Sequence, residues 1–465
     1  MVGLTEAFPL DEVAIHQVLE TPPQEDSVRV RELLAKAREM KGLDDTDLPA
    51  LMTIRDPQLL QELFDTARWV KDQIYGNRIV LFAPLYVSNQ CGNECLYCAF
   101  RASNRELPRR TLSQEEIATE VHCLLAQGHK RLVLVAGEEY PGEGLDYVIS
   151  AIRTVYDVRH GKDNIRRVNV NIAPLEVDDF KRLRDAEIGT YQLFQETYHR
   201  ETYRQMHPRG IKADYDWRLG CMDRAMMAGI DDVGIGALFG LYDWRFELLA
   251  TMQHARHLED RFGCGPHTIS MPRIEPADGS STSEAPPYAV SDEDFSKIIA
   301  ILRLAVPYTG LILSTRERPE VRRQVMHLGI SQISAGSRTN PGGYEEGSGN
   351  GGGQFSLGDH RSLDEVVRDL AEMGFIPSFC TSCYRMGRTG VDFMDIAKPG
   401  EIKAHCNPNA LSTLQEYLED HASPLTRCSA EQLMARSFTD LGDPARKIAE
   451  GMVARVKRGE RDVFC

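Results

Sequence analysis

From residue 78 onward, short apolar runs rich in β-branched residues alternate with longer segments in which apolar residues recur every three or four positions. The short runs predict buried strands, and the longer segments predict amphipathic helices. Eight strand-like runs follow one another, at 78–86, 131–137, 167–173, 190–195, 232–239, 267–273, 310–315 and 332–337. This alternation predicts an α/β fold with a parallel sheet, and eight units are typical of a (β/α)8 TIM barrel. A doubly wound open sheet is the alternative.

Capping residues indicate where several helices begin and end. Asp56 followed by Pro57 predicts a helix start, and Gly76 predicts its end. Ser113 with Glu116 forms the capping-box pattern that opens a helix over 114–127.

The pattern divides the chain into three regions. We expect an N-terminal helical cover over 1–76, the barrel over 77–378 and a C-terminal extension over 379–465, with helices near 411–418 and 430–437. The glycine-rich stretch 340–353 follows the eighth strand, and we interpret it as a connector rather than a functional flap.

Composition excludes several classes of protein. The 465 residues carry a net charge of −15, which argues against nucleic acid as a partner. No signal peptide and no apolar stretch near membrane-spanning length is apparent, so we expect a cytoplasmic protein that does not enter a membrane. The chain contains 11 cysteines. An odd number in a large chain of this kind argues against a disulfide framework.

Three cysteines, Cys91, Cys95 and Cys98, follow the first predicted strand in a CxxxCxxC pattern. A closed zinc site or a fully ligated iron–sulfur cluster takes four protein ligands. Three thiolates on a four-iron cluster leave one iron open to another ligand. A zinc loop or unrelated buried cysteines are the alternatives.

This triplet resembles the signature of the radical S-adenosylmethionine (SAM) enzymes, in which Tyr97 would be the usual aromatic residue before the third cysteine. The resemblance implies a [4Fe-4S] cluster whose open iron binds SAM and splits it to a 5′-deoxyadenosyl radical. Ala136, Gly137 and Glu138 resemble the Gly-Gly-Glu motif that holds the SAM amino group, although alanine replaces its first glycine.

Further polar residues follow later strands, at the barrel end where chemistry is expected. Glu196 at the fourth strand would contact the SAM ribose or methionyl group, and Arg204 or Arg218 would pair with its carboxylate. Arg316 ends the seventh strand. A buried arginine there needs an anion, and the carboxylate of an amino acid substrate is suitable.

A second cysteine group, Cys380, Cys383 and Cys406, has the pattern CxxC-x22-C. Its chain position, after a helix that runs back from the eighth strand, predicts a second cluster at the opposite end of the barrel. Zinc would need a fourth ligand, and His405 is the near candidate. His267 begins the sixth predicted strand at that same end, so it is either a ligand to a second iron site or a structural histidine.

The two cysteine groups together resemble the tyrosine lyases of the radical SAM group that help to mature [FeFe]-hydrogenase. That resemblance implies cleavage of the Cα–Cβ bond of L-tyrosine to p-cresol and dehydroglycine, with Arg316 and Glu196 in the active site. It further implies carbon monoxide and cyanide formation on a second [4Fe-4S] cluster, which carries an additional iron bound by free cysteine and by His267.

The implied partners are SAM, L-tyrosine, an electron donor such as ferredoxin or flavodoxin, and other hydrogenase maturation proteins. Two alternatives remain open: a thiazole-pathway tyrosine lyase, which lacks the second cysteine group, and an iron–sulfur scaffold without catalytic activity.

Overall fold

The computed structural model describes residues 8–139, 142, 144–347 and 352–465 and contains a closed parallel barrel. Its eight strands lie next to one another in chain order, and pairing of the last with the first, Val80 with Gln332, closes the ring. The strands are β1 (Arg78–Ser88), β2 (Arg131–Ala136), β5 (Arg167–Asn171), β6 (Tyr191–Gln192), β7 (Val233–Gly236), β8 (Thr268–Ser270), β9 (Gly310–Leu313) and β10 (Gln332–Ser334). The predicted (β/α)8 barrel is confirmed, and the open-sheet alternative is wrong.

The observed strands are shorter than predicted at several positions, and three short strands were not predicted. β11 (Ile376–Ser378) pairs with the beginning of β1, with Arg78 opposite Ile376. The short β3 (Arg159–His160) and β4 (Asp163–Asn164) form a separate hairpin.

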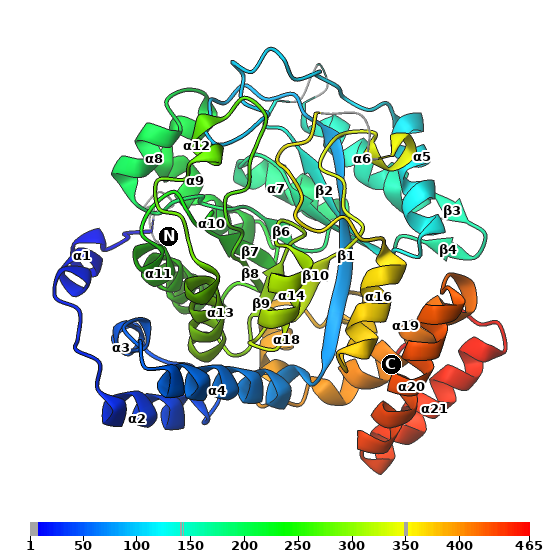
Figure 1. The fold of residues 1–465 in the computed structure, drawn as a ribbon. Helices are drawn as coiled ribbons and strands as arrows, with labels where there is room; N and C mark the ends of the chain where they lie inside the picture. The colour runs from blue at the N-terminus through cyan, green and yellow to red at the C-terminus, as the bar shows by residue number, and fades with distance from the viewer. Residues whose placement is uncertain (1–7, 140–141, 143, 348–351) are drawn as a thin grey trace.

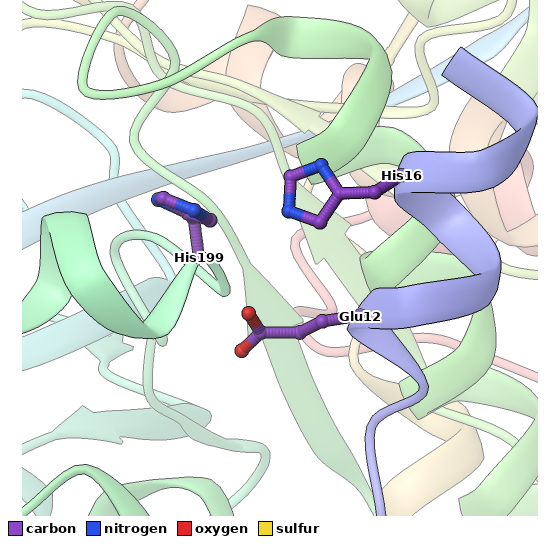
Figure 2. A group of neighbouring side chains, drawn as sticks. All are labelled: Glu12, His16 and His199. Carbon is purple, nitrogen blue, oxygen red and sulfur yellow. The ribbon is translucent and has the colours of Figure 1, made fainter. Parts of the chain in front are cut away.

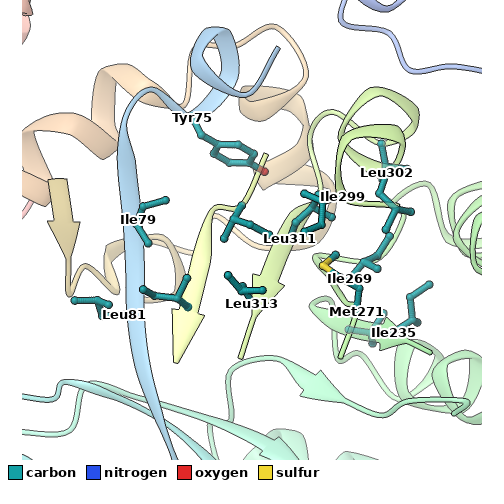
Figure 3. Packing of buried hydrophobic residues seen from close by; sticks show 14 of the residues in the cluster. Tyr75, Ile79, Leu81, Ile235, Ile269, Met271, Ile299, Leu302, Leu311 and Leu313 are labelled. Atoms are coloured by element: carbon teal, nitrogen blue, oxygen red, sulfur yellow. The ribbon is translucent and has the colours of Figure 1, made fainter. Parts of the chain in front are cut away.

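Helices surround the barrel and bury the outward faces of its strands (Figure 1). They are α5 (Gln114–Ala126), α6 (Leu145–Asp157), α7 (Val177–Asp185), α8 (Arg200–Met206), η1 (Ile211–Ala213), α9 (Tyr215–Leu219), α10 (Cys221–Met227), α11 (Trp244–Phe262), α12 (Ser281–Glu284), α13 (Asp292–Ala305), α14 (Pro319–Met326), α15 (Gly343–Glu346) and α16 (Leu363–Glu372). Alternation along β1 separates the two faces. Ile79 and Leu81 belong to the large buried cluster, part of which is drawn in Figure 3, whereas Phe82 belongs to a separate cluster with Val133 and Ile312.

The N-terminal helices α1 (Glu12–Glu20), α2 (Ser27–Ala37), α3 (Leu48–Met52) and α4 (Pro57–Tyr75) precede the first strand. α4 begins as predicted, because the Asp56 carboxylate accepts hydrogen bonds from the backbone N–H groups of Gln58 and Leu59, both at 2.9 Å. It ends at Gly76, whose φ of 64° is in the left-handed region. α4 packs against α13 and leads directly into β1 at the lower end of the barrel in Figure 1.

The C-terminal elements gather at that same end of the barrel, close to the start of β1 (Figure 1). They comprise α17 (Ser382–Arg385), α18 (Gly390–Ala397), α19 (Lys403–Asp420), α20 (Pro424–Asp440) and α21 (Asp443–Lys457). The helices predicted near 411–418 and 430–437 are present but longer than expected, and α21 was not predicted.

Within the described residues, no helix has both the length and the apolar character needed to cross a membrane.

Part of the glycine-rich stretch, 348–351, lies outside the described residues. The part before it forms α15, in which the Glu120 carboxylate accepts hydrogen bonds from the backbone N–H groups of Tyr344 and Glu345. Gln354 and Phe355, directly after the glycine-rich stretch, line a cavity at the barrel mouth. The predicted connector therefore leads directly into residues that line this cavity.

Candidate active site and candidate metal centres

Two cavities lie at opposite ends of the barrel, and each contains cysteines of one predicted group. The mouth cavity lies at the carboxyl ends of the strands, and its walls include Tyr97, Cys95, Cys98, Glu196, Arg218 and Arg316. The base cavity lies at the beginnings of the strands, and its walls include Arg78, Arg131, His267, Cys380, Cys383 and Cys406.

Arg109 organises the loop that carries the first cysteines. Its guanidinium donates hydrogen bonds to four backbone carbonyls of this loop, at distances of 2.6 to 3.2 Å: those of Asn89, Phe100, Arg101 and Asn104. Further backbone hydrogen bonds, Leu96 N–H to Met206 O and Ala99 N–H to Gln354 O, attach the loop to the end of α8 and to the segment after α15. These hydrogen bonds hold the cysteine loop in place from several sides.

The cysteines of the first group are thiols whose pKa values are raised by their surroundings. Burial raises the pKa of Cys95 well above its usual value and that of Cys98 to about 11, with the neighbouring cysteines adding to both increases. Binding to the iron of a cluster would stabilise them as thiolates. Three free cysteines on one ordered loop fit a cluster that keeps one iron open.

Gly137 and Glu138 lie directly against the cysteine loop. A Cβ atom on Gly137 would lie only 2.1 Å from the Gln90 carbonyl oxygen, so no larger residue fits there. Glu138 accepts hydrogen bonds from Asn93 Nδ2 at 2.8 Å and Arg218 Nη1 at 2.9 Å. Burial alone would raise the pKa of Glu138, but Arg218, Lys212 and these hydrogen bonds together lower it. Ala136 is buried at the end of β2.

Glu196 joins a group of four alternating charges at the cavity wall. Its carboxylate lies 2.6 Å from Lys212 Nζ and 3.5 Å from Arg218 Nη2. Its φ of 71° is unusual for a residue other than glycine, and such local strain is often found at functional sites. Arg218 also donates to the Phe194 carbonyl at 2.7 Å.

Arg204 does not reach this site. Its side chain is 77% exposed and pairs with Glu201 on the same helix, α8. Of the two predicted arginines, only Arg218 lines the cavity.

Tyr97 is fixed by a buried chain of hydrogen bonds. Its hydroxyl lies 2.8 Å from His207 Nε2, and His207 Nδ1 lies 2.8 Å from the Tyr203 carbonyl oxygen. The carbonyl can only accept, so Nδ1 carries the proton and Nε2 accepts from Tyr97. Burial and the nearby Lys212 lower the pKa of His207 well below its usual value, which keeps the ring neutral.

The Arg316 guanidinium lines the mouth cavity, and its positive charge requires an anionic partner. Its guanidinium carbon lies 3.2 Å from the centre of the Phe355 ring, and no carboxylate among the described residues lies within ion-pair distance. Burial lowers the pKa of Arg316, although Tyr86 and Glu196 oppose this effect. A bound carboxylate would supply the missing anion and both acceptors of a two-pronged contact.

The base cavity collects its cysteines from two elements. Cys380 and Cys383 flank the start of α17, and Cys406 lies in the first turns of α19. Burial raises the pKa of Cys383 to about 12 and raises that of Cys406. Nε of Arg78 and Nε of Arg131 are buried without hydrogen-bond partners among the described residues, which suits a site for an anionic cluster or ligand. The cysteines and these cations therefore fit a second cluster.

His267 lies immediately before β8 and lines this base cavity. Its ring packs on Phe393 at 4.9 Å between centres, and its Nδ1 lies 3.6 Å from Asp232 Oδ1 without a hydrogen bond. Burial lowers the pKa of His267, which favours the neutral ring that a metal requires. His405 is not among the residues that line the cavity.

Comparison with known proteins agrees with this geometry. The model of the radical SAM superfamily matches residues 85–253, and that of the biotin and thiamin synthesis associated domain matches residues 270–376. The 2-iminoacetate synthase of Escherichia coli (strain K12) is 33% identical over 344 residues, which cover 74% of this chain and 88% of that protein.

Two solved structures resemble almost the whole chain. A crystal structure of HydG, a maturase of the [FeFe]-hydrogenase, is 48% identical with a TM-score of 0.95, and the match covers 98% of this chain and 99% of that one. The structure of HydG from Carboxydothermus hydrogenoformans is 41% identical with a TM-score of 0.81, and the match covers 95% and 96%.

Barrel, cysteine loop and family matches together define a radical SAM enzyme, whose family implies a [4Fe-4S] cluster with SAM. Within this superfamily the chain belongs to the family that includes HydG and 2-iminoacetate synthase. The predicted class, a radical SAM lyase, is thereby confirmed at the level of the family.

Sequence reasoning missed two residues that line the mouth cavity, Lys212 and Phe355, and one that holds the cysteine loop, Arg109. Lys212 lies in the short helix η1, and neither its spacing nor its neighbours form a motif. Arg109 contacts only backbone groups, which no sequence pattern reveals. Phe355 follows the glycine-rich stretch, whose composition indicated a connector.

Proposed function

We propose that this chain is a tyrosine lyase that cleaves the Cα–Cβ bond of L-tyrosine to p-cresol and dehydroglycine. Dehydroglycine would then yield carbon monoxide and cyanide at the base cavity, for an iron–carbonyl–cyanide unit used in [FeFe]-hydrogenase maturation. The observation that carries the proposal is the pair of cysteine-lined cavities at opposite ends of one barrel.

At the mouth, Cys91, Cys95 and Cys98 would hold the [4Fe-4S] cluster. The cluster and SAM, when bound, would supply the radical that takes a hydrogen atom from the tyrosine amine. Glu138, Glu196 and Arg218 would hold polar groups of SAM, and Arg316 would bind the tyrosine carboxylate. Fixing that carboxylate at the wall would orient the amine and Cα toward the radical source.

At the base, Cys380, Cys383 and Cys406 would hold the second [4Fe-4S] cluster, and His267 would bind an additional iron together with free cysteine. A low-potential donor such as ferredoxin or flavodoxin would supply electrons, and other maturation proteins would receive the product. The base cysteines favour this function over that of 2-iminoacetate synthase, because the thiazole-pathway lyase lacks the second cysteine group. Similarity to HydG over 98% of the chain supports the same choice, since the 2-iminoacetate synthase match covers 74%.

The test distinguishes the reactions that we propose for the two cavities. Replacing Cys380, Cys383 and Cys406 together by alanine should leave p-cresol formation from tyrosine and abolish carbon monoxide, because only the base would lose its metal. Both products are quantified in the same anaerobic reaction, with Cys428→Ala as the control, because Cys428 is exposed and lines neither cavity.

Loss of both products, with the first cluster still present by iron and sulfide counting, would contradict separate roles for the two cavities. Wild-type enzyme that forms p-cresol without carbon monoxide would favour the 2-iminoacetate synthase activity. Protein that loads clusters but never cleaves SAM would favour the scaffold alternative.

A further inference from the structure

Glu12, His16 and His199 converge outside both cavities. Glu12 and His16 lie four residues apart on α1 and therefore on one face of that helix, and His199 precedes α8 on the barrel. One ligand atom from each residue lies within 4.8 Å of the other two. Figure 2 shows the three side chains directed toward one shared space between α1 and the barrel.

From this convergence we propose a binding site for a divalent metal ion of the zinc type, formed by the Glu12 carboxylate and the imidazoles of His16 and His199. Two imidazoles and one carboxylate are a common ligand set for Zn²⁺ and related ions, with a further position open to water. Tetrahedral binding would need the ligand atoms roughly 3.3 Å apart, given metal–ligand bonds of about 2.0–2.1 Å. The half-buried side chains would close onto the ion by rotating.

The surroundings orient both histidines. His199 Nδ1 lies 2.8 Å from Thr202 Oγ1 and accepts a long hydrogen bond, 3.3 Å, from the Thr202 backbone N–H. Metal binding through Nε2 would move the ring proton to Nδ1, where Thr202 Oγ1 would accept it in place of that bond. The His199 ring stacks on Tyr242 with 3.8 Å between ring centres, and the His16 ring packs on Phe246 at 5.1 Å. His16 has no hydrogen-bond partner among the described residues, so its nitrogens are available.

Glu12 is available as well. Its Oε1 accepts from the Arg200 backbone N–H at 3.3 Å, which leaves the carboxylate free to rotate toward the histidines. The Arg200 guanidinium lies 3.9 Å from Glu12 but is committed to Asp216, with two hydrogen bonds of 2.9 and 3.0 Å. The negative charge of Glu12 is therefore only partly compensated.

A second cluster of possible metal ligands differs from the proposed site, because its carboxylates already pair with cations of the protein. Asp163, Asp420 and His421 also converge, but Lys130 pairs with Asp163 at 2.5 Å, and Arg461 binds both carboxylate oxygens of Asp420. Those charges are neutralised within the protein, so that cluster has no need of a metal. The proposed site, in contrast, would attach α1 to the segment that begins three residues after Glu196.

The experiment uses the full chain with both cysteine groups loaded anaerobically with clusters, so that thiolates do not compete for zinc. After equilibration with Zn²⁺ and removal of the excess, we expect about one zinc per chain beyond the cluster metals, because the three ligands form a single site. Glu12→Gln and His16→Gln should weaken zinc binding by at least about tenfold, since each removes a ligand. The controls are Glu20→Gln on the same helix and His122→Gln on the surface, which should bind as wild type.

Two further readouts do not depend on activity. Co²⁺ should give the visible absorption of a nitrogen and oxygen site in wild type but not in Glu12→Gln or His16→Gln, and Zn²⁺ should raise the thermal midpoint only when both residues are present. Circular dichroism checks that the variants are folded. The proposal is overturned by wild-type holoenzyme that binds no additional zinc, or by the two variants retaining wild-type zinc affinity.

Discussion

Lys212 Nζ lies 2.6 Å from Glu196 Oε1, and Glu196 holds this contact from a backbone φ of 71°. The lysine is buried, so its charge requires a close anion. Burial and Arg218 would lower the pKa of Lys212, but Cys95, Glu196 and Glu138 together raise it above its usual value. The pair thus forms a charged wall that adjoins the first cysteine group.

This wall predicts a specific effect of Glu196→Gln. The substitution keeps the shape but removes the charge, leaving Lys212 and Arg218 with one carboxylate instead of two. We expect SAM affinity to fall by about tenfold, the effect of losing a charge-assisted hydrogen bond of about 1.5 kcal/mol. Equilibrium binding of SAM to the cluster-loaded protein measures it. Glu201→Gln on α8 is the control, and a decrease of equal size there would contradict a local role for Glu196.

Arg109 should control loading of the first cluster without touching the metal. Arg109→Ala leaves four loop carbonyls without their donor, so the cysteine loop should lose its built geometry. We expect iron and sulfide at the first site to fall while the second cluster remains, as resolved by electron paramagnetic resonance. Arg105→Ala, an exposed change in the same loop, should load normally. Normal loading in Arg109→Ala would show that the cysteines organise the loop by themselves.

Glu247 should make stability depend on pH. It is fully buried on α11, and burial raises its pKa from 4.5 to about 8, although hydrogen bonds from Thr197 and from the Tyr198 backbone oppose this. An acid whose pKa is raised on folding binds its proton more tightly when folded. Its contribution is therefore full below pH 4.5 and is lost as pH rises toward 8, at roughly 1.4 kcal/mol per pH unit.

Glu247→Gln removes that titration while keeping one acceptor and one donor for the same partners. The variant should lose less stability than wild type between pH 6 and pH 8, as measured by thermal midpoints of the anaerobic holoenzyme. Parallel pH profiles for the two proteins would contradict a protonated Glu247.

The sequence predicted what depends on local patterns and short spacing. The caps at Asp56 and Ser113 bind nearby backbone groups, so they formed where expected. The first cysteine group was recognisable because three ligands to one cluster on one loop require a fixed short spacing. Strand alternation gave the barrel, since burying each strand and helix face leaves few other arrangements.

Tertiary contacts decided the remainder. The sequence did not distinguish Arg204 from Arg218 as the candidate for the site. Only Arg218 points inward, because its guanidinium donates hydrogen bonds to Glu138 and to the Phe194 carbonyl. Gly234 of β7 is another residue whose role depends on its neighbours in space. A Cβ on Gly234 would lie 2.5 Å from Thr268 Oγ1 and 2.9 Å from Gln192 Cγ. β11 was missed because three residues carry too little periodicity to predict a strand.

Arg316 gives the sharpest test of the substrate class. Its guanidinium lies over the Phe355 ring, with no carboxylate of the described protein in ion-pair distance, so a substrate carboxylate would be its anion. Arg316→Lys keeps the charge but loses the two-pronged contact, and tyrosine affinity should fall by about tenfold or more.

SAM affinity should change much less, because Glu138, Glu196 and Arg218 remain. Arg318→Lys, two residues away and 67% exposed, is the matched control. Binding of each ligand to the cluster-loaded protein separates the two effects. Equal losses for tyrosine and SAM would remove Arg316 from the substrate site, whereas a selective loss for tyrosine would assign it the carboxylate.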